Sequence, residues 1–514
     1  MVAAEWYLSP RERGNPWTRL DARHPGGRAW SEGNSVTPLI HGAAYFTALT
    51  ERVSAMQAGD LLLFVDWRGD PDERLTGEPG SEVARLFAEA ARRGVDVRGL
   101  VWRSHWDRLA FSAAENRHLG EDIDAAGGEC YLDMRVRLGG SHHQKFVVLR
   151  HPGRPGLDIA FLGGIDLCHS RRDDADHAGD PQPQPMAAVY GDRPPWHDVQ
   201  LALTGPVVGD VETVFRERWE DPQALTRSPI RLLVDNARGT RPRRRPLPPQ
   251  LPDPAPTGEH PVQLLRTYGR RLGGYAFAPR GERSVARGYA KAFANARRLI
   301  YLEDQYLWSS EVCALLVATL RRAPDLRLVA VLPHQPDQDG AVSRAPNLVS
   351  RARLLEELHA AAPGRVGVYG IENHAGTPVY VHAKVCVVDD EWVTVGSDNL
   401  NRRSWTHDSE LSAAVAHRGF ARELRQALAR EHLDTECELE LEDHFDAYAS
   451  SAQTLESWRT SAASSTAATR PPGRLRPLDN PEQRRLTRLW ADPLYRLVYD
   501  PDGRPLDLRL KRTF

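Results

Sequence analysis

A His-x-Lys pattern occurs twice in this chain, and its repetition constrains the fold more than any other feature of the sequence. The first copy contains His143 and Lys145, and the second contains His382 and Lys384, 239 residues later. The chain has only four lysines among its 67 basic residues, and two of them occupy this pattern. Residues two apart on a β-strand project from the same face, so each copy predicts an imidazole beside an ammonium group. Two such strands facing each other would form a phosphate site with two histidines.

Each copy is followed by a glycine and polar positions. The first copy leads to Gly164 and Asp166, and the second leads to Ser397 and Asn399. The side chains of Ser397 and Asn399 can donate hydrogen bonds to phosphate oxygens. We therefore predict that Gly164, Asp166, Ser397 and Asn399 bind substrate.

The surroundings of the two copies indicate an internal duplication. Asp66 to His143 spans 77 residues, and Glu303 to His382 spans 79. In both halves, apolar runs typical of buried strands alternate with segments of helical periodicity. We expect an α/β protein built from two duplicated α/β/α domains, with the active site at their interface. The expected helices are residues 42–56, 81–93, 311–322 and 420–433, and the expected strands are residues 61–65, 95–101, 300–302, 326–332, 385–388 and 392–395.

Further segments carry a resemblance to a known family. They are Tyr301-Leu302-Glu303-Asp304-Gln305-Tyr306, Gly163-Gly164-Ile165-Asp166-Leu167, Pro195-Trp196-His197-Asp198 and Gly396-Ser397-Asp398-Asn399-Leu400-Asn401-Arg402-Arg403-Ser404. Together with the paired His-x-Lys segments, they resemble the phospholipase D superfamily. The similarity is to two-motif phospholipases D of the eukaryotic type, in an arginine-rich sequence of bacterial appearance, and it extends over about residues 35–440.

The resemblance implies phosphodiester chemistry through a phosphohistidine. His143 would attack phosphorus, and His382 would protonate the leaving oxygen and then activate water or a second alcohol. The residue types alone do not distinguish these two roles. Lys145 and Lys384 would neutralise the phosphoryl oxygens.

Each histidine also needs a carboxylate that fixes its tautomer. Glu410 follows His382 by 28 residues, the spacing that its family counterpart has, and this assigns Glu410 to the second half. Asp198 occupies the matching place in the first half, so we expect it to serve His143.

The first copy departs from the family pattern at one position. The second copy has Asp389 five residues after Lys384, whereas the first copy has Arg150 there. In the family this aspartate supports structure more than chemistry, so the expected role of Asp389 is supporting. Asp158 is a candidate replacement in the first half.

Composition and resemblance together divide the chain into four parts. We expect a first phospholipase D-like domain in residues 1–237 and a second in residues 263–445, separated by an exposed Pro- and Arg-rich linker in residues 238–262. Residues 446–514 are expected to contain a flexible segment at 450–472, rich in Ser, Ala and Thr, and a C-terminal hairpin at 489–510 with a Pro-Asp-Gly turn.

Composition also limits the classes of partner that the protein is expected to bind. The net charge of −2 gives no general attraction to nucleic acid, and five irregularly spaced cysteines fit neither a disulfide framework nor a zinc motif. We expect no secretory signal and no membrane span. The expectation is a cytoplasmic enzyme that contacts its phospholipid substrate at the membrane surface. It would need no metal or other cofactor and, because both motifs lie in one chain, no oligomer.

The roles of two groups of residues remain open at this point. Residues 168–180 are rich in histidine and aspartate, but they lack the twelve-residue spacing of an EF-hand, and we expect a solvated loop without a metal. Trp67, Trp196, Trp308 and Trp405 follow strands or motif segments. They would line a lipid entrance or pack in the core.

Three functions are compatible with these residues. A phospholipase D would hydrolyse phospholipid headgroups, transfer the phosphatidyl group to alcohols, or do both. A nuclease or another phosphodiesterase would use the same histidines, but the charge balance counts against it. A non-catalytic lipid-binding or scaffold protein would not need both His-Lys pairs. The sequence does not specify the headgroup or the acyl chains.

Overall fold

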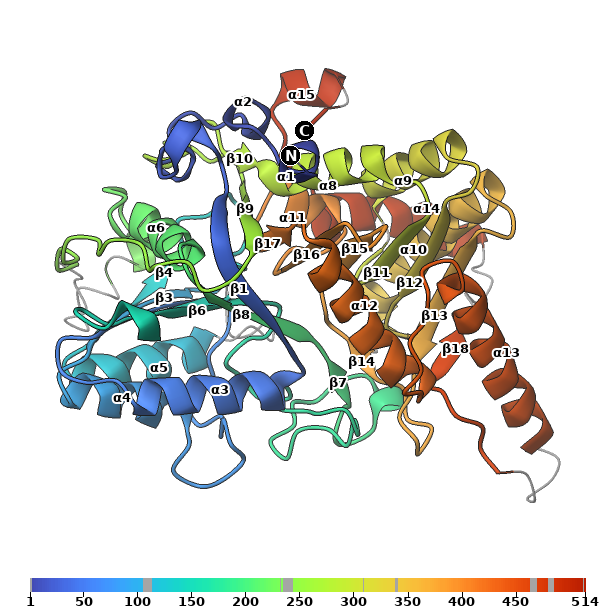
Figure 1. The fold of residues 1–514 in the computed structure, drawn as a ribbon, viewed down its shortest axis with the longest axis horizontal. Helices are drawn as coiled ribbons and strands as arrows, with labels where there is room; N and C mark the ends of the chain where they lie inside the picture. The colour runs from blue at the N-terminus through green and yellow to red at the C-terminus, as the bar shows by residue number, and fades with distance from the viewer. Residues whose placement is uncertain are drawn as a thin grey trace.

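The structure is a computed structural model that describes residues 2–104, 113–231, 233, 244–307, 309–337, 341–462, 469–478, 485–511 and 513–514. One mixed β-sheet runs through both halves of the chain, with helices on both of its faces (Figure 1). The strands of the first half, in spatial order, are β4 (Glu129–Asp133), β3 (Asp96–Trp102), β2 (Leu61–Asp66), β5 (Phe146–Arg150), β6 (Ile159–Gly163), β8 (Val199–Thr204) and β1 (Ser31–Ile40). Those of the second half are β13 (Val366–Ile371), β12 (Arg327–Val331), β11 (Leu299–Glu303), β15 (Val385–Val388), β16 (Trp392–Gly396), β17 (Ser409–Val415) and β9 (His260–Tyr268).

The strand order confirms the predicted duplication. In each half the first three strands of this order are parallel to one another, and the remaining neighbours are antiparallel. The halves meet where β1 pairs with β9, at Ser31 with Val262 and at Asn34 with His260. The expected two α/β/α domains are therefore present, but their sheets form one continuous surface.

Successive side chains along the buried strands point to opposite faces of the sheet and build a core on each face. Leu61, Leu63 and Val65 of β2 face one side, whereas Leu62 and Phe64 face the other. The first side is covered by α6 (Val207–Trp219), α12 (Arg418–Leu433) and α13 (His444–Ala462), and its core continues through both halves. The second side is covered by α3 (Gly42–Ser54), α4 (Val83–Arg92) and α5 (Ala113–Ala125) in the first half and by α8 (Ser284–Asn295), α9 (Ser310–Arg322) and α10 (Ala341–Ala361) in the second.

The predicted C-terminal hairpin is wrong. Its residues form α14 (Arg485–Leu494), η6 (Tyr495–Tyr499) and α15 (Leu506–Lys511). Ala491 and Tyr495 are both buried and lie four residues apart, which is helical spacing. The short apolar alternation in the sequence fits both periods, and packing of α14 against α10 selects the helix.

The segment expected to be flexible is also largely helical. α13 extends to Ala462 and buries Tyr448, Ala452 and Leu455 at spacings of four and three residues. Residues 463–468 lie outside the described residues. Small polar residues are compatible with a helix wherever one apolar stripe can be buried.

The Pro-rich linker is docked along the first half over its described part. Residues 244–258 contain no helix or strand, as predicted, and residues 238–243 lie outside the described residues. Arg244 donates to the carbonyl oxygens of Trp219 and Asp221 at 2.6 and 2.7 Å. None of the helices in the described part of the chain is long and apolar enough to cross a membrane.

Candidate active site

Each His-x-Lys segment lies in extended chain just before a central strand and is paired with the opposite half. The His143 backbone N–H donates to the Ser409 carbonyl oxygen at 2.9 Å, at the start of β17. The His382 N–H donates to the His197 carbonyl oxygen at 2.8 Å, where β14 (Tyr380–Val381) pairs with β7 (Trp196–His197). Each histidine strand therefore runs beside the segment of the other half that carries a carboxylate.

This pairing determines which carboxylate orients which histidine. His143 Nδ1 lies 3.0 Å from Glu410 Oε2, and His382 Nδ1 lies 2.6 Å from Asp198 Oδ2. The prediction that each carboxylate serves the histidine of its own half is wrong, because the two carboxylates are exchanged between the halves. The choice of Asp198 and Glu410 as the orienting carboxylates agrees with this geometry. In both pairs the contact is made through Nδ1, which leaves Nε2 for chemistry.

The two lysines are anchored by backbone and carboxylate oxygens. Lys145 Nζ donates to the His143 carbonyl oxygen at 2.9 Å and lies 3.4 Å from Asp166 Oδ1. Lys384 Nζ donates in the same way to the carbonyl oxygen of His382. Burial, with the charge of Lys145, lowers the pKa of Lys384 to about 8.

Each histidine also experiences the lysine of the other half. Burial lowers the pKa of His143 well below its usual range, and Lys145 and then Lys384 add to the effect. Burial likewise lowers the pKa of His382, with contributions from Lys384, Arg171 and Lys145. The structure thus brings the two histidines and both lysines into one electrostatic environment with both imidazoles neutral.

Pairs of carboxylates at the strand ends complete this environment. Asp66, the last residue of β2, accepts a hydrogen bond from the Leu167 N–H, and Asp304, directly after β11, accepts one from the Leu400 N–H, both at 2.9 Å. Burial and the neighbouring Asp166 raise the pKa of Asp66. Burial opposes ionisation of Asp166 as well, but Lys145 and then Arg171 lower its pKa to about 2.

The net charge of this buried site favours an anion. Burial raises the pKa of Asp304 to about 8, and burial with Asp408 raises the pKa of Glu410 to about 8. Near neutral pH, Asp166 is therefore ionised, and it lies 3.4 Å from Lys145 Nζ. Positive charge in excess in a desolvated site is what a phosphoryl group requires.

Gly164 and Ser397, which follow the two His-x-Lys segments, lie against the carboxylates of Asp198 and Glu410. A Cβ atom at Gly164 would lie 2.2 Å from Asp198 Oδ1, so only glycine fits there. Ser397, at the equivalent position, donates its hydroxyl to Glu410 Oε2 at 2.6 Å. The side-chain oxygen of Asn399 is buried without a hydrogen-bond partner in the structure. The substrate-binding roles of Gly164, Asp166, Ser397 and Asn399 stay predictions.

Asp389 acts at a distance from these groups. Its carboxylate accepts hydrogen bonds from the backbone N–H groups of Arg297, Arg298 and Leu299 at 2.7, 2.8 and 2.7 Å, at the start of β11. This is the supporting position that the sequence indicated. The aspartate also adopts a left-handed backbone conformation, with φ of 55°, in the turn after β15.

Arg150 is buried where the first motif lacks this aspartate. It lies 3.2 Å from Asp158 Oδ2 and 3.0 Å from Glu212 Oε2, and it donates to the Pro252 carbonyl oxygen at 2.7 Å. Asp158 accepts a hydrogen bond from the His151 N–H at 2.6 Å. The first half thus replaces a carboxylate that caps a strand with a buried ion pair.

Two tryptophans and one arginine adjoin the reacting groups. Trp67 contacts His143 edge-on, with ring centroids 5.9 Å apart, and Trp196 lies 4.9 Å from the His382 ring. The Arg171 guanidinium lies 3.9 Å from the Trp196 ring centre. Arg171 is not among the site residues predicted from the sequence, although its place shortly after Gly164 was an available signal. Trp405 is buried against Tyr289, 5.2 Å away, and Trp308 lies outside the described residues.

The loop expected to be solvated is partly buried. Asp173, His177 and Asp180 are all buried, and the His177 ring lies 3.0 Å from Glu431 Oε1 of the second half. Exposed positions within residues 168–180 are confined to 174–176 and 178. The prediction of a solvated loop is therefore wrong for its anchoring residues.

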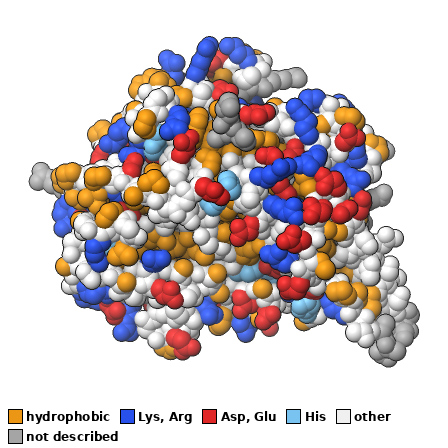
Figure 2. All heavy atoms as spheres, viewed as in Figure 1, with side chains coloured by type: hydrophobic (Ala, Val, Ile, Leu, Met, Phe, Trp, Pro, Cys, Tyr) orange, Lys and Arg blue, Asp and Glu red, His pale blue; other side chains and the backbone are white. Residues whose placement is uncertain are grey.

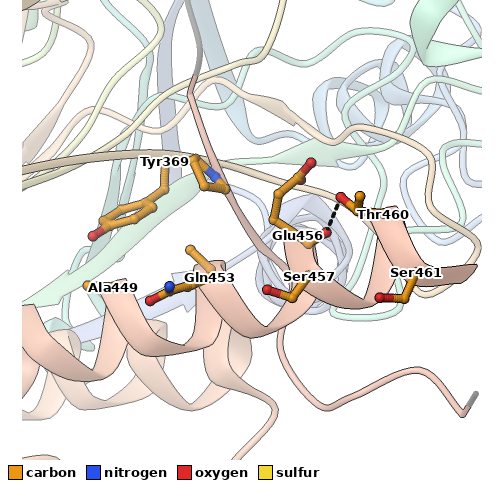
Figure 3. Close-up of a pocket in the computed structure, with 9 residues that line it drawn as sticks. Tyr369, Ala449, Gln453, Glu456, Ser457, Thr460 and Ser461 are labelled. Carbon is orange, nitrogen blue, oxygen red and sulfur yellow. Dashed lines mark hydrogen bonds between the residues drawn. The ribbon is translucent and has the colours of Figure 1, made fainter.

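A hollow on the surface away from the histidines lacks the charge needed for a phosphate. This hollow, between α13, β13 and β18 (Leu475–Pro477), is shown in Figure 3. None of the nine residues that line it is Lys, Arg or His. On the face drawn in Figure 2, acidic and basic side chains are interspersed rather than gathered in one basic stripe.

Two family models match the two halves of the chain. The model described as "Phospholipase D" matches residues 73–245, and the model described as "Cardiolipin synthase, PLD-like domain" matches residues 289–431. Each match contains one His-x-Lys segment. The chain as a whole therefore contains both motif-bearing regions of this type.

Similar proteins and structures agree with these matches. The chain is 26% identical to "Phospholipase D alpha 1" of Cynara cardunculus, over 71% of this chain and 60% of that protein. It is 24% identical to "Phospholipase D1" of Saccharomyces cerevisiae, over 78% of this chain and 29% of that protein. The chain spans about three fifths or less of the length of these relatives. The fold is similar to the crystal structure of phosphatidylserine synthase from Haemophilus influenzae, with a TM-score of 0.53, 14% identity and coverage of 83% of this chain and 93% of that one.

Proposed function

The chain belongs to the phospholipase D superfamily, and from this premise we propose that it is a phosphodiesterase acting on phospholipid headgroups through a phosphohistidine. One observation carries the proposal: two neutral imidazoles from different halves share one site with both motif lysines, each oriented through Nδ1 by a buried carboxylate. Such an arrangement suits a reaction that needs a nucleophile and a proton donor on opposite sides of phosphorus.

The proposed reaction has two steps. His143 Nε2 attacks phosphorus and forms the N–P bond while the P–O bond to the headgroup alcohol breaks. His382, which takes up a proton on Nε2 as the phosphate anion binds, gives this proton to the leaving oxygen, and the neutral His382 then takes a proton from water or an alcohol, which attacks phosphorus and releases His143. The greater exposure of the His143 side chain, 14% against 6% for His382, supports His143 as the nucleophile.

The phosphoryl oxygens would be held by Lys145, Lys384 and Arg171. Both lysines are almost fully buried, and Arg171 lies against Trp196 with its guanidinium 3.7 Å from Asp166 Oδ2. Charges that are fixed before the substrate arrives cost no reorganisation during the reaction.

We also propose that the membrane is approached through two exposed loops near His143. Leu138 and Leu272 are 96% and 87% exposed, and their loops are joined by a hydrogen bond of 2.7 Å from Arg137 to the Arg270 carbonyl oxygen. Exposed leucines flanked by arginines suit the surface of a bilayer with anionic lipid. The Leu138 loop leads directly into the segment that contains His143.

The substrate class can be tested with two substrates in parallel. Purified protein is incubated with phosphatidylcholine vesicles plus ethanol, and separately with single-stranded DNA. Phosphatidic acid or phosphatidylethanol formation that is lost in His382→Ala and kept in His118→Ala supports the proposal, since His118 is an exposed surface histidine. The ratio of phosphatidic acid to phosphatidylethanol measures hydrolysis against transfer.

The alternative functions give different results in the same assay. Cleaved DNA with intact lipid would identify a nuclease of the same superfamily. Vesicle binding without either reaction would identify a lipid-binding or scaffold protein. Leu138→Glu with Leu272→Glu should reduce vesicle binding and activity on vesicles, while activity on a soluble short-chain phospholipid is unchanged.

A further inference from the structure

A second cluster of buried histidines lies directly behind the active site and plays no part in the proposed reaction. It consists of His41, His177, His197 and Glu431. The three histidines are 4%, 0% and 0% exposed. Each of the four residues has one nitrogen or oxygen atom that lies within 4.8 Å of the corresponding atoms of the other three.

The carboxylate of Glu431 is the centre of this cluster. Its Oε2 lies 2.8 Å from His41 Nε2, and its Oε1 lies 3.0 Å from His177 Nε2 and 3.3 Å from His197 Nδ1. Three imidazole nitrogens and one carboxylate oxygen form a ligand set that zinc and neighbouring transition metals prefer, whereas calcium and magnesium prefer oxygen alone. Ligand atoms around a tetrahedral zinc ion lie about 3.4 Å apart, which follows from Zn–N bonds of about 2.0–2.1 Å. The three separations from Glu431, 2.8, 3.0 and 3.3 Å, and the 4.8 Å limit on the others are compatible with this spacing.

The hydrogen bonds of the cluster are incomplete in a way that points to a ligand. His197 Nδ1 is buried, faces Glu431 and makes no hydrogen bond. The other nitrogen of this ring, Nε2, lies 2.7 Å from Glu303 Oε2. A carboxylate on the outer nitrogen is the usual partner of a metal-bound histidine, since it fixes the tautomer and makes the inner nitrogen a better ligand. His177 Nδ1 lies 3.7 Å from Asp173 Oδ2, which provides the same arrangement at a longer distance.

The backbone supplies an independent observation. His41 and His177 adopt left-handed conformations, with φ of 69° and 54°. Such conformations are unfavourable for residues other than glycine, and they are concentrated where a structure must hold a side chain in one place. Both of these side chains are directed at Glu431.

The four residues come from separate parts of the fold and join its halves. His41 precedes α3, His177 lies in the loop after β6, His197 is on β7, and Glu431 is on α12 of the second half. The cluster is also continuous with the active site, because the His41 N–H donates to the Asp198 carbonyl oxygen at 2.8 Å.

We propose that His41, His177, His197 and Glu431 form a structural binding site for a divalent transition-metal ion of the zinc class. All four positions are filled by protein groups, the three histidines buried and Glu431 half-buried, which is typical of structural rather than catalytic sites. The ion would tie the loop, β7 and α12 together and hold the strand that carries Asp198.

Metal content and thermal stability test this site without reference to activity. Protein purified without a metal-affinity tag is analysed by elemental mass spectrometry and then unfolded with and without a strong chelator. About one equivalent of zinc or a neighbouring metal per chain is expected, and the chelator should lower the Tm of the wild type. Cobalt added to the stripped protein should give the visible absorption bands of a tetrahedral centre.

Matched variants localise the effect. Glu431→Gln and His177→Gln should lose the metal and the chelator-dependent change in Tm, whereas His118→Gln should keep both. Because chelation of the wild type requires no substitution, the test holds even if a variant fails to fold. Without a metal ion, protons on two of the imidazoles would balance the negative charges of Glu431 and Glu303. A wild-type protein that takes up less than a tenth of an equivalent of zinc or cobalt, with a Tm that the chelator leaves unchanged, would establish that proton network and overturn the proposal.

Discussion

The protons shared by His143 and Glu410 determine which nitrogen of this imidazole can react. The pKa of His143 is lowered and that of Glu410 is raised to about 8, so near neutral pH the neutral imidazole and the carboxyl group hold two protons between them. When Glu410 ionises, the remaining imidazole proton lies on Nδ1, and Nε2 then carries a free lone pair. His382 and Asp198 form the equivalent pair, with shifts in the same directions. The two histidines therefore begin in similar states, and access and substrate orientation separate their roles.

The nucleophile can be identified by blocking the second step. In His382→Asn, a phosphatidyl ester of p-nitrophenol should still release p-nitrophenol, because this leaving group needs no acid, but no base remains to activate water. We expect one burst of release per enzyme molecule and a phosphatidyl adduct on the peptide that contains His143, measured by mass spectrometry. His143→Asn should give no burst. An adduct on His382 in His143→Asn, with none in His382→Asn, would reverse the roles.

The rate should be highest near pH 8. Lys384 and Glu410 both have pKa values of about 8 in the site, so a rise in pH through this value ionises Glu410, which frees the lone pair of His143 Nε2, but also removes a cation from the phosphate. The gain and the loss oppose each other, so log kcat/KM should rise with a slope of +1 below pH 8 and fall with a slope of −1 above it.

Glu410→Gln tests this interpretation. The amide cannot ionise but can still accept from Nδ1–H, so the variant should be slower and should lose the rise below pH 8 while it keeps the fall above it. A wild-type rate that stays level to well above pH 8 would contradict the assignment.

At the scale of single elements, the two strands that follow the His-x-Lys segments are anchored by different groups at their far ends. β15 is followed by Asp389, whose carboxylate accepts hydrogen bonds from three N–H groups at the start of β11. β5 ends in Arg150, which is held by Asp158 and Glu212. Neither group touches the reacting atoms, and both fix a strand that carries them.

Asp389→Ala should therefore destabilise the protein without changing its chemistry. The loss of three hydrogen bonds to a charged acceptor should lower the free energy of unfolding by about 2–4 kcal/mol, while kcat per folded molecule is unchanged. Glu391→Ala in the same turn is the control, because Glu391 makes only a 3.4 Å ion pair with exposed Arg418. Denaturant unfolding measures the difference. A large fall in kcat at full folding would assign Asp389 to the chemistry.

The sequence predicted secondary-structure elements better than it predicted which residues lie side by side in the folded protein. Residues two apart in His-x-Lys, and strands such as 385–388, follow from local periodicity, and the structure has them where expected. The exchange of Asp198 and Glu410 depends on which strand lies beside which, and chain spacing holds no such information. Residues 489–510 fitted two periods equally well, so tertiary packing decided between them.

The buried histidine cluster could not be predicted for a related reason. His41, His197 and Glu431 are separated by 156 and 234 residues, and none of them belongs to a metal-binding motif in the sequence. His177 was noticed only because its loop is rich in acidic residues. Only the folded chain brings these four residues together.

For the whole molecule, the continuous sheet makes the halves one cooperative unit. β1 pairs with β9, and each histidine strand pairs with the opposite half at Ser409 or His197. The core beneath α6, α12 and α13 is also shared. The covalent linker is then a connection that the folded protein does not need in order to stay together.

Cleavage of the linker tests this statement. A protease site inserted between exposed Pro248 and Pro249 should be cut in the native protein. The two fragments should elute together in size-exclusion chromatography and retain most of the activity, because large shared interfaces hold obligate partners together. The uncut protein with the same insertion is the control. Separation of the fragments without denaturant would contradict a single cooperative unit.

The exchanged carboxylates have a consequence for the order in which the protein is made. When residues 1–237 have left the ribosome, His143 is present but Glu410, which sets its tautomer, has not been synthesised. The nascent first half therefore lacks a prepared nucleophile, and the site with two histidines forms only after residue 410 emerges and docks. Any activity that needs both histidines must wait for the synthesis of the second half.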